Sequence, residues 1–252
     1  MKPNFFEPFK CLPKSAGLML VHPSWTLGLM ALTALLSIGA SLLGRHFGLP
    51  SQLQLSLTDD MDGVMKHSLL NLAVLFPLEL YFLPRWILAT DAGSPDSVHA
   101  PKMGDSKDNW KQLFEERWGR VFLARLVLGA ATSIGFFLCL VPGILVLIFF
   151  GWTPWRVLLR GESIVAAARS CARNMAALWP QVLMAAAAIM LVVLVFNGFA
   201  ATAAEAIAGD YAPHASTAAS AVSMVWMNAA LLALYQWMDK SGPRDQGLGG
   251  ML

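Results

Sequence analysis

Residues 25–43 read WTLGLMALTALLSIGASLL, a stretch that contains no charged side chain. An α-helix rises about 1.5 Å per residue, so about 20 apolar residues are needed to cross a hydrocarbon core of about 30 Å. This stretch therefore predicts a membrane-spanning helix. Five further apolar stretches predict the same structure, which gives six spans at residues 25–44, 68–88, 121–141, 144–159, 178–203 and 217–238.

The composition of the whole chain supports the same fold class. Apolar residues make up 56% of the sequence and charged residues 13%, whereas average proteins have about 45–50% and about 25%. So few charges cannot cover a water-facing surface. We therefore predict an all-α, polytopic bundle of six transmembrane helices. The net charge of +2 is a sum over opposing faces and indicates no nucleic-acid partner.

The distribution of Lys and Arg predicts the orientation of the bundle. Fifteen of the 18 basic residues lie at the two ends or in alternate loops, whereas the other loops hold only Arg45 and Lys66. Arg125 lies within the third span. Because short loops rich in Lys and Arg stay in the cytoplasm, both termini are expected there, in a multi-pass protein of the bacterial inner membrane. An aromatic belt is expected at the inner boundary, from Trp25, Trp86, Trp152, Trp155, Trp179 and Trp237.

Three parts follow one another along the chain. Residues 1–24 form a cytoplasmic or interfacial segment, in which Phe5, Phe6, Phe9 and Leu12 lie among Lys10 and Lys14. Residues 25–238 form the membrane domain. Its cytoplasmic loop, residues 89–120, contains an amphipathic helix over about 107–120 that is expected on the membrane surface and leads into the third span. Residues 239–252 form a cytoplasmic tail.

Several residues predict how the spans are connected and packed. Pro142 and Gly143 separate spans three and four, so a tight antiparallel hairpin is expected with its turn at this pair. Pro154 is expected to kink or end span four. Spans five and six are rich in Ala, Gly and Ser, which allow close backbone approach in lipid. These two spans are expected to pack on neighbouring spans, on a second copy or on another membrane protein.

Two ionisable residues lie within predicted spans. Glu79 lies between Pro77 and Pro84, and Arg125 lies in the inner half of the next span. A charge in hydrocarbon costs about 2.5–3.5 kcal/mol on the lenient insertion scale, so each side chain needs a partner or an aqueous cavity. Three interpretations stay open: a structural Glu79–Arg125 pair, a proton- or substrate-linked role for Glu79 in a small transporter, and snorkelling of both. Neutral polar residues in the spans include Asn197, Asn228 and Gln236.

Four arginines gather around the loop between spans four and five. Arg156 and Arg160 are four residues apart, as are Arg169 and Arg173, so each pair shares one helical face. Guanidinium groups at the inner headgroup level can bind lipid phosphates bidentately. We therefore take these four arginines as candidates for contact with anionic lipid of the cytoplasmic leaflet or with a partner. The alternative is that they only retain the loop in the cytoplasm.

Evidence for catalysis or a metal site is weak. Glu115, Glu116 and Arg120 match the Glu-Glu-x-x-x-Arg motif of intramembrane metalloproteases related to the CAAX-processing enzymes. Histidines that would complete a metal site are missing, since the only later one is His214 in an outer loop. Three scattered cysteines predict neither a disulfide framework nor a metal site. No cofactor, no metal and no catalytic residue is predicted, and an intramembrane hydrolase is the least favoured function.

A resemblance to known families rests on a series of short motifs. It is carried by Val141-Pro142-Gly143-Ile144, Pro154, Gly161-Glu162-Ser163, Ala168-Arg169-Ser170, Arg173-Asn174 and Trp179. The pattern is similar to poorly characterised bacterial inner-membrane families, namely the YciC-like proteins and the membrane domain that accompanies some glycerophosphodiester phosphodiesterases. This resemblance covers roughly residues 105–200 and implies a six-helix membrane protein without an assigned reaction. The expected function is that of a non-catalytic membrane module.

Overall fold

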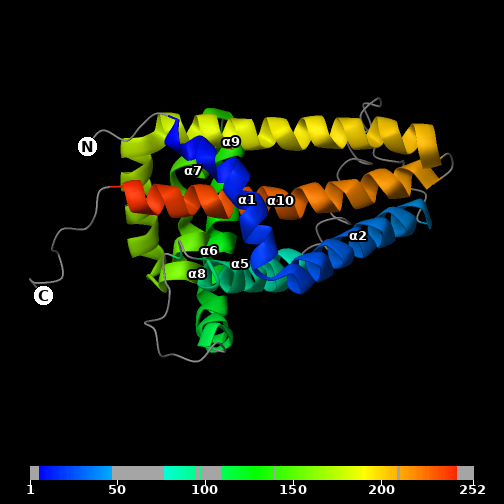
Figure 1. Ribbon diagram of the computed structural model, residues 1–252. Coiled ribbons are helices and arrows are strands. Elements are labelled where there is room, and N and C mark those ends of the chain that lie inside the picture. Colours follow the sequence, from blue (N-terminus) through cyan, green and yellow to red (C-terminus); the bar gives the residue numbers. More distant parts are fainter. Residues whose placement is uncertain are drawn as a thin grey trace, which may run out of the picture. The chain divides into compact units, whose positions relative to one another are not determined.

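Helices make up nearly all of the chain that a computed structural model describes, which comprises residues 6–46, 77–94, 97, 109–138, 140–208 and 211–242. No strand occurs within these ranges, so the all-α fold class is confirmed. The elements, drawn in Figure 1, are η1 (Glu7–Lys10), α1 (Cys11–Val21), α2 (Pro23–His46), η2 (Leu78–Phe82), α5 (Leu83–Ala92), α6 (Asn109–Leu138), α7 (Leu140–Phe150), α8 (Thr153–Arg160), α9 (Ile164–Ala208) and α10 (Ala212–Ser241).

Four stretches of helix among the described residues are long and apolar enough to cross a membrane. They are Pro23–Ala40, Val141–Arg160, Ile164–Ala208 and His214–Ser241. This result supports a membrane protein in general. Part of the second predicted span, residues 68–76, lies outside the described residues, as do predicted loop residues between it and α2.

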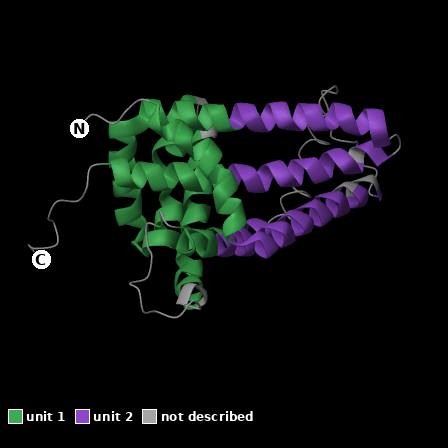
Figure 2. Ribbon diagram, in the orientation of Figure 1, with its two compact units in different colours: residues 1–21, 87–189, 229–252 green, residues 22–86, 190–228 purple. Residues whose placement is uncertain are grey.

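The chain divides into two compact units, coloured separately in Figure 2. Unit 1 contains Met1–Val21, Ile87–Ile189 and Ala229–Leu252. Its buried core is formed by large side chains from five helices, including Ile87, Phe114, Leu159, Met175 and Tyr235, each at most 2% exposed. Burial of a large apolar side chain contributes about 1.5–3 kcal/mol, so these contacts hold the helices of unit 1 together.

The Pro142-Gly143 pair, expected at the turn between the third and fourth predicted spans, lies within a helix instead. α6 ends at Leu138 and α7 begins at Leu140, so the Pro142-Gly143 pair lies in the first turn of α7. Proline is tolerated in the first turn of a helix because the backbone N–H that it lacks would have no intrahelical partner there. Pro142 therefore begins a helix instead of separating two helices.

Two glycines bring α6 and α7 together. A Cβ placed on Gly135 of α6 would lie 2.8 Å from both the Cα and the backbone N of Gly143 in α7. This distance is shorter than any real side chain could accept against backbone atoms. Close backbone approach through small residues is typical of helix pairs in lipid, where it increases van der Waals contact.

The amphipathic helix expected over about 107–120 and the third predicted span are one continuous helix, α6. The fourth predicted span is interrupted instead, because α7 ends at Phe150 and α8 begins at Thr153. Pro154 lies in the first turn of α8, so the expected helix break at this proline is present. α6 packs against both α7 and α8.

Unit 2 contains His22–Trp86 and Met190–Asn228. Its parts of α9 and α10 are joined by a hydrogen bond, in which Ser223 Oγ donates to Asn197 Oδ1 at 2.9 Å. Small residues such as Ala204 and Ala221 are buried, whereas Leu194 and Phe199 are 70% and 77% exposed. Apolar side chains with this exposure suit a helix surface that faces lipid.

Candidate functional site

Arg156 lies on α8 and is buried, with 2% of its surface exposed. Its Nε donates to Glu162 Oε2 at 3.1 Å and its Nη2 to Glu162 Oε1 at 2.9 Å, which is a bidentate pair. Its Nη1 donates to Asp239 Oδ1 near the end of α10 at 3.3 Å. A buried guanidinium requires partners of this kind, because desolvation of an unpaired charge costs several kcal/mol.

Arg160 contacts the same two carboxylates. Its Nη2 donates to Asp239 Oδ2, and its Nη1 lies 3.7 Å from Glu162 Oε1. Its side chain is 29% exposed, whereas that of Asp239 is 4% exposed. Two arginines and two carboxylates thus form a charge-balanced network, which we call the α8–α10 network and which consists of Arg156, Arg160, Glu162 and Asp239.

Aromatic rings surround this network on one side. Tyr235 is fully buried, and its ring centroid lies 6.0 Å from that of Trp152 and 6.2 Å from that of Trp155. The two tryptophan rings lie edge to face with centroids 5.8 Å apart. Aromatic contacts at these distances are favourable and reduce access of water, which strengthens the neighbouring ion pairs.

Arg117 and Arg120 of α6 bind the carboxyl end of α8. Arg117 Nη1 donates to the carbonyl oxygens of Leu158 and Leu159, both at 2.8 Å, and Arg120 Nη1 donates to that of Gly161 at 3.0 Å. These carbonyls lie at the end of a helix, where cations are favourable. Burial, with a smaller contribution from Arg120, lowers the pKa of Arg117. The arginine of the Glu-Glu-x-x-x-Arg motif thus contacts backbone at a helix end.

Gly161 makes this arrangement possible. Its φ of 65° is left-handed, a conformation that glycine adopts without strain at the end of a helix. A Cβ at this position would lie 3.0 Å from the guanidinium carbon of Arg117. Glycine therefore suits the left-handed backbone turn and leaves room for the guanidinium of Arg117.

Arg169 and Arg173 are not part of the network. Both lie near the start of α9 with exposed side chains, one helical turn apart. Val165 and Trp179 of the same helix are 68% and 51% exposed. Two of the four candidate arginines thus belong to the α8–α10 network, and the other two are at exposed positions of α9.

A second buried polar contact connects α5 and α10. Gln236 Nε2 donates to Asp91 Oδ1 at 2.6 Å, and Ser97 Oγ donates to Asp91 Oδ2 at 3.0 Å. Asp91 is 1% exposed and Gln236 is fully buried. This contact gives Gln236, which the sequence marks only as a polar residue within a span, a partner in unit 1.

Glu79 and Arg125 lie in different compact units. Glu79 is exposed on η2 of unit 2, and Arg125 is half-buried on α6 of unit 1. Pairing between them stays a prediction. Leu78–Phe82 adopts a π-helix, a form that is rare and frequent at functional sites.

The described cysteines are buried and not bonded to each other. Cys11 and Cys171 are free thiols, and Cys139 lies outside the described residues. Burial raises the pKa of Cys11 to about 11, so its thiol stays protonated and unreactive at neutral pH. No group of three or more metal-ligating side chains occurs within the described part of the chain.

Comparisons with family models, with curated proteins and with solved structures found no match for this chain. The resemblance to YciC-like proteins therefore stays a prediction. The function has to be argued from the arrangement of the residues alone, and above all from the separation of the two arginine pairs.

Proposed function

We propose that this chain is a non-catalytic module of the bacterial inner membrane that contacts anionic lipid through Arg169 and Arg173. In this proposal the protein has six spans and both termini in the cytoplasm. The observation that carries the proposal is the exposure of these two residues on one face of α9. Arg156 and Arg160 have a different role, since they bind Glu162 and Asp239 within the protein.

The surroundings of the exposed pair suit a position at the membrane interface. Val165 precedes Arg169 by one helical turn, and Trp179 follows Arg173. Exposed apolar and aromatic side chains beside cations are typical of helices at the headgroup level. Each arginine near an anionic leaflet contributes about 1 kcal/mol, and each can bind a phosphate through two hydrogen bonds.

The double substitution Arg169→Gln/Arg173→Gln is expected to weaken binding of phosphatidylglycerol at least about tenfold, since about 2 kcal/mol of attraction is removed. Native mass spectrometry of the delipidated protein, titrated with this lipid, measures the change. The matched control is Lys10→Gln/Lys240→Gln, which removes the same charge from two other exposed positions. Equal losses in both variants would mean that total charge, and not this site, determines binding.

A second candidate function is transport that depends on Glu79. The observation in its favour is the π-helical turn Leu78–Phe82, which places this carboxyl on an irregular backbone between Pro77 and Pro84. Glu79→Gln is then expected to abolish proton flux into proteoliposomes, measured with a pH-sensitive dye, while the helical circular dichroism signal stays unchanged. Wild-type flux no greater than that of empty vesicles would contradict this function.

A further inference from the structure

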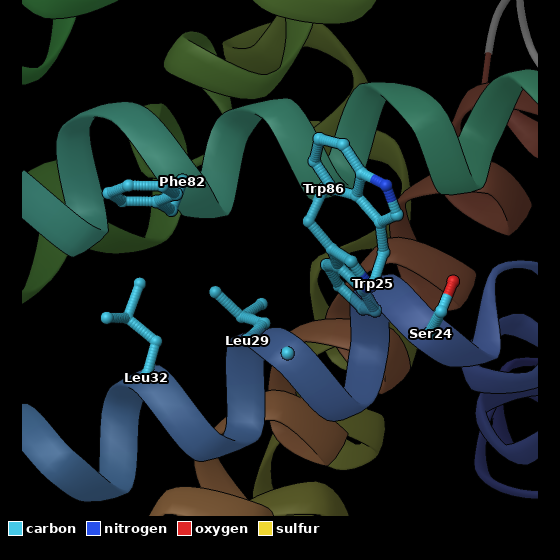
Figure 3. Close-up of a pocket in the computed structure, with 7 residues that line it drawn as sticks. Ser24, Trp25, Leu29, Leu32, Phe82 and Trp86 are labelled. Atoms are coloured by element: carbon cyan, nitrogen blue, oxygen red, sulfur yellow. The ribbon is translucent and has the colours of Figure 1, made fainter.

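Unit 2 contains a pocket of about 300 Å³ between α2 and the helical segment formed by η2 and α5. Figure 3 shows the rings of Phe82 and Trp86 pointing from one helix toward Leu29 and Leu32 on the other. The remaining lining residues are Ser24, Trp25 and Gly28. Because Trp25 and Phe82 are each 41% exposed, the pocket opens to the surface as a groove.

The interior of this groove is mostly apolar, and the indole N–H of Trp86 beside it has a partner. Trp86 Nε1 donates to Thr26 Oγ1 at 3.1 Å, and Thr26 Oγ1 donates to the carbonyl oxygen of His22 at 3.1 Å. These bonds join the two walls of the groove and fix the indole ring of Trp86. The walls therefore present carbon surface to an occupant, with the indole donor already used.

The position of the groove determines what fills it. α2 contains the membrane-length stretch Pro23–Ala40, only 22% of which is buried. Leu27 and Leu35 on the same helix are 65% and 68% exposed, so the groove is continuous with a surface that faces hydrocarbon in a bilayer. An extended protein segment would bring backbone polar groups that find no partner there, whereas a hydrocarbon chain brings none.

The two ends of the groove differ in polarity. Ser24 and Trp25 lie at the start of α2, where the aromatic belt is expected, and Leu32 lies two helical turns further along. Phe82 faces the Leu32 end and Trp86 faces the Trp25 end (Figure 3). This polarity matches an amphiphile with its headgroup near Ser24 and its tail along Leu29 and Leu32.

We propose that this groove binds one acyl chain of a membrane phospholipid and retains that lipid irrespective of its headgroup charge. The inference is independent of the arginine pair on α9, since none of its residues lines the groove. Gly28 provides the space for the chain, because a Cβ at this position meets no atom within 4 Å.

The test is native mass spectrometry of the delipidated full chain with a few equivalents of zwitterionic phosphatidylcholine. Wild type is expected to retain one lipid, Gly28→Ala to retain less, and Gly28→Leu to reduce the bound fraction at least fivefold. Gly39→Leu is the matched control, because Gly39 lies on the same helix, has open space around its Cβ and does not line the groove. The Arg169→Gln/Arg173→Gln variant is expected to bind phosphatidylcholine like wild type, even if it also keeps its affinity for phosphatidylglycerol.

Three results would overturn the inference. Equal retention by Gly28→Leu and Gly39→Leu would show that the lipid binds elsewhere, as would a wild type that retains none. A wild-type dimer that Gly28→Leu dissociates would assign the groove to a second copy. Gly28→Ala adds a single methyl group to open space, so this variant keeps the test valid if the leucine variant does not fold.

Discussion

Replacing Arg156 with methionine is expected to lower the free energy of unfolding by about 3–5 kcal/mol, because it removes the buried guanidinium that binds both carboxylates of the network and leaves only Arg160 to balance them. Asp239 and Arg156 have side chains that are 4% and 3% exposed, so water cannot replace the lost contact. Methionine keeps much of the side-chain length. Titration of the detergent-solubilised protein with SDS measures the change.

Two further variants separate the ion pair from other effects of this substitution. Arg169→Met removes the same charge from an exposed position and should change stability by less than about 0.5 kcal/mol. Arg156→Met/Asp239→Asn restores the charge balance of the α8–α10 network and should recover part of the loss. If Arg156→Met alone is as stable as Arg169→Met, the α8–α10 network has no structural role.

The helices could be predicted from the sequence because a helix that crosses a lipid bilayer needs a long stretch of apolar residues. The first and last predicted spans, residues 25–44 and 217–238, lie within α2 and α10. Both helices extend a few residues beyond the apolar stretches, since a helix continues through the headgroup layer before a charge or a turn ends it. The break within the fourth span was expected at Pro154, because proline lacks a backbone donor.

The sequence predicts only the two arginines of the α8–α10 network and not its two carboxylates. Counting Lys and Arg for topology ignores carboxylates, so Glu162 and Asp239 were not recognised as partners of Arg156 and Arg160. Glu162 could have been found, since it follows Arg156 by six residues, directly after a glycine that ends the helix. Asp239 could not have been found in this way, because it lies 83 residues from Arg156 in the sequence and contacts it only when the two helices pack together.

The position of the turn between α6 and α7 could not be read from residue types either. A Pro-Gly pair is compatible with a loop between two helices and also with the first residues of a helix. In the structure the pair lies in the first turn of α7, where Gly143 packs against Gly135 of α6. Glycine was expected here for its backbone freedom. Its role in the structure is its small size, which two packed helices require.

Gly135→Val is therefore expected to destabilise the protein by about 3 kcal/mol, because the added Cβ would lie 2.8 Å from backbone atoms of Gly143. Backbone in a helix cannot move away like a flexible side chain, so α6 and α7 would have to separate. Gly129→Val is the matched control, since Gly129 lies on the same helix and its Cβ meets no atom within 4 Å. SDS titration should show a loss for position 135 that is several times larger than that for position 129. Equal losses would assign the effect to the bulk of a β-branched side chain at any position of this helix and would contradict the close contact between α6 and α7.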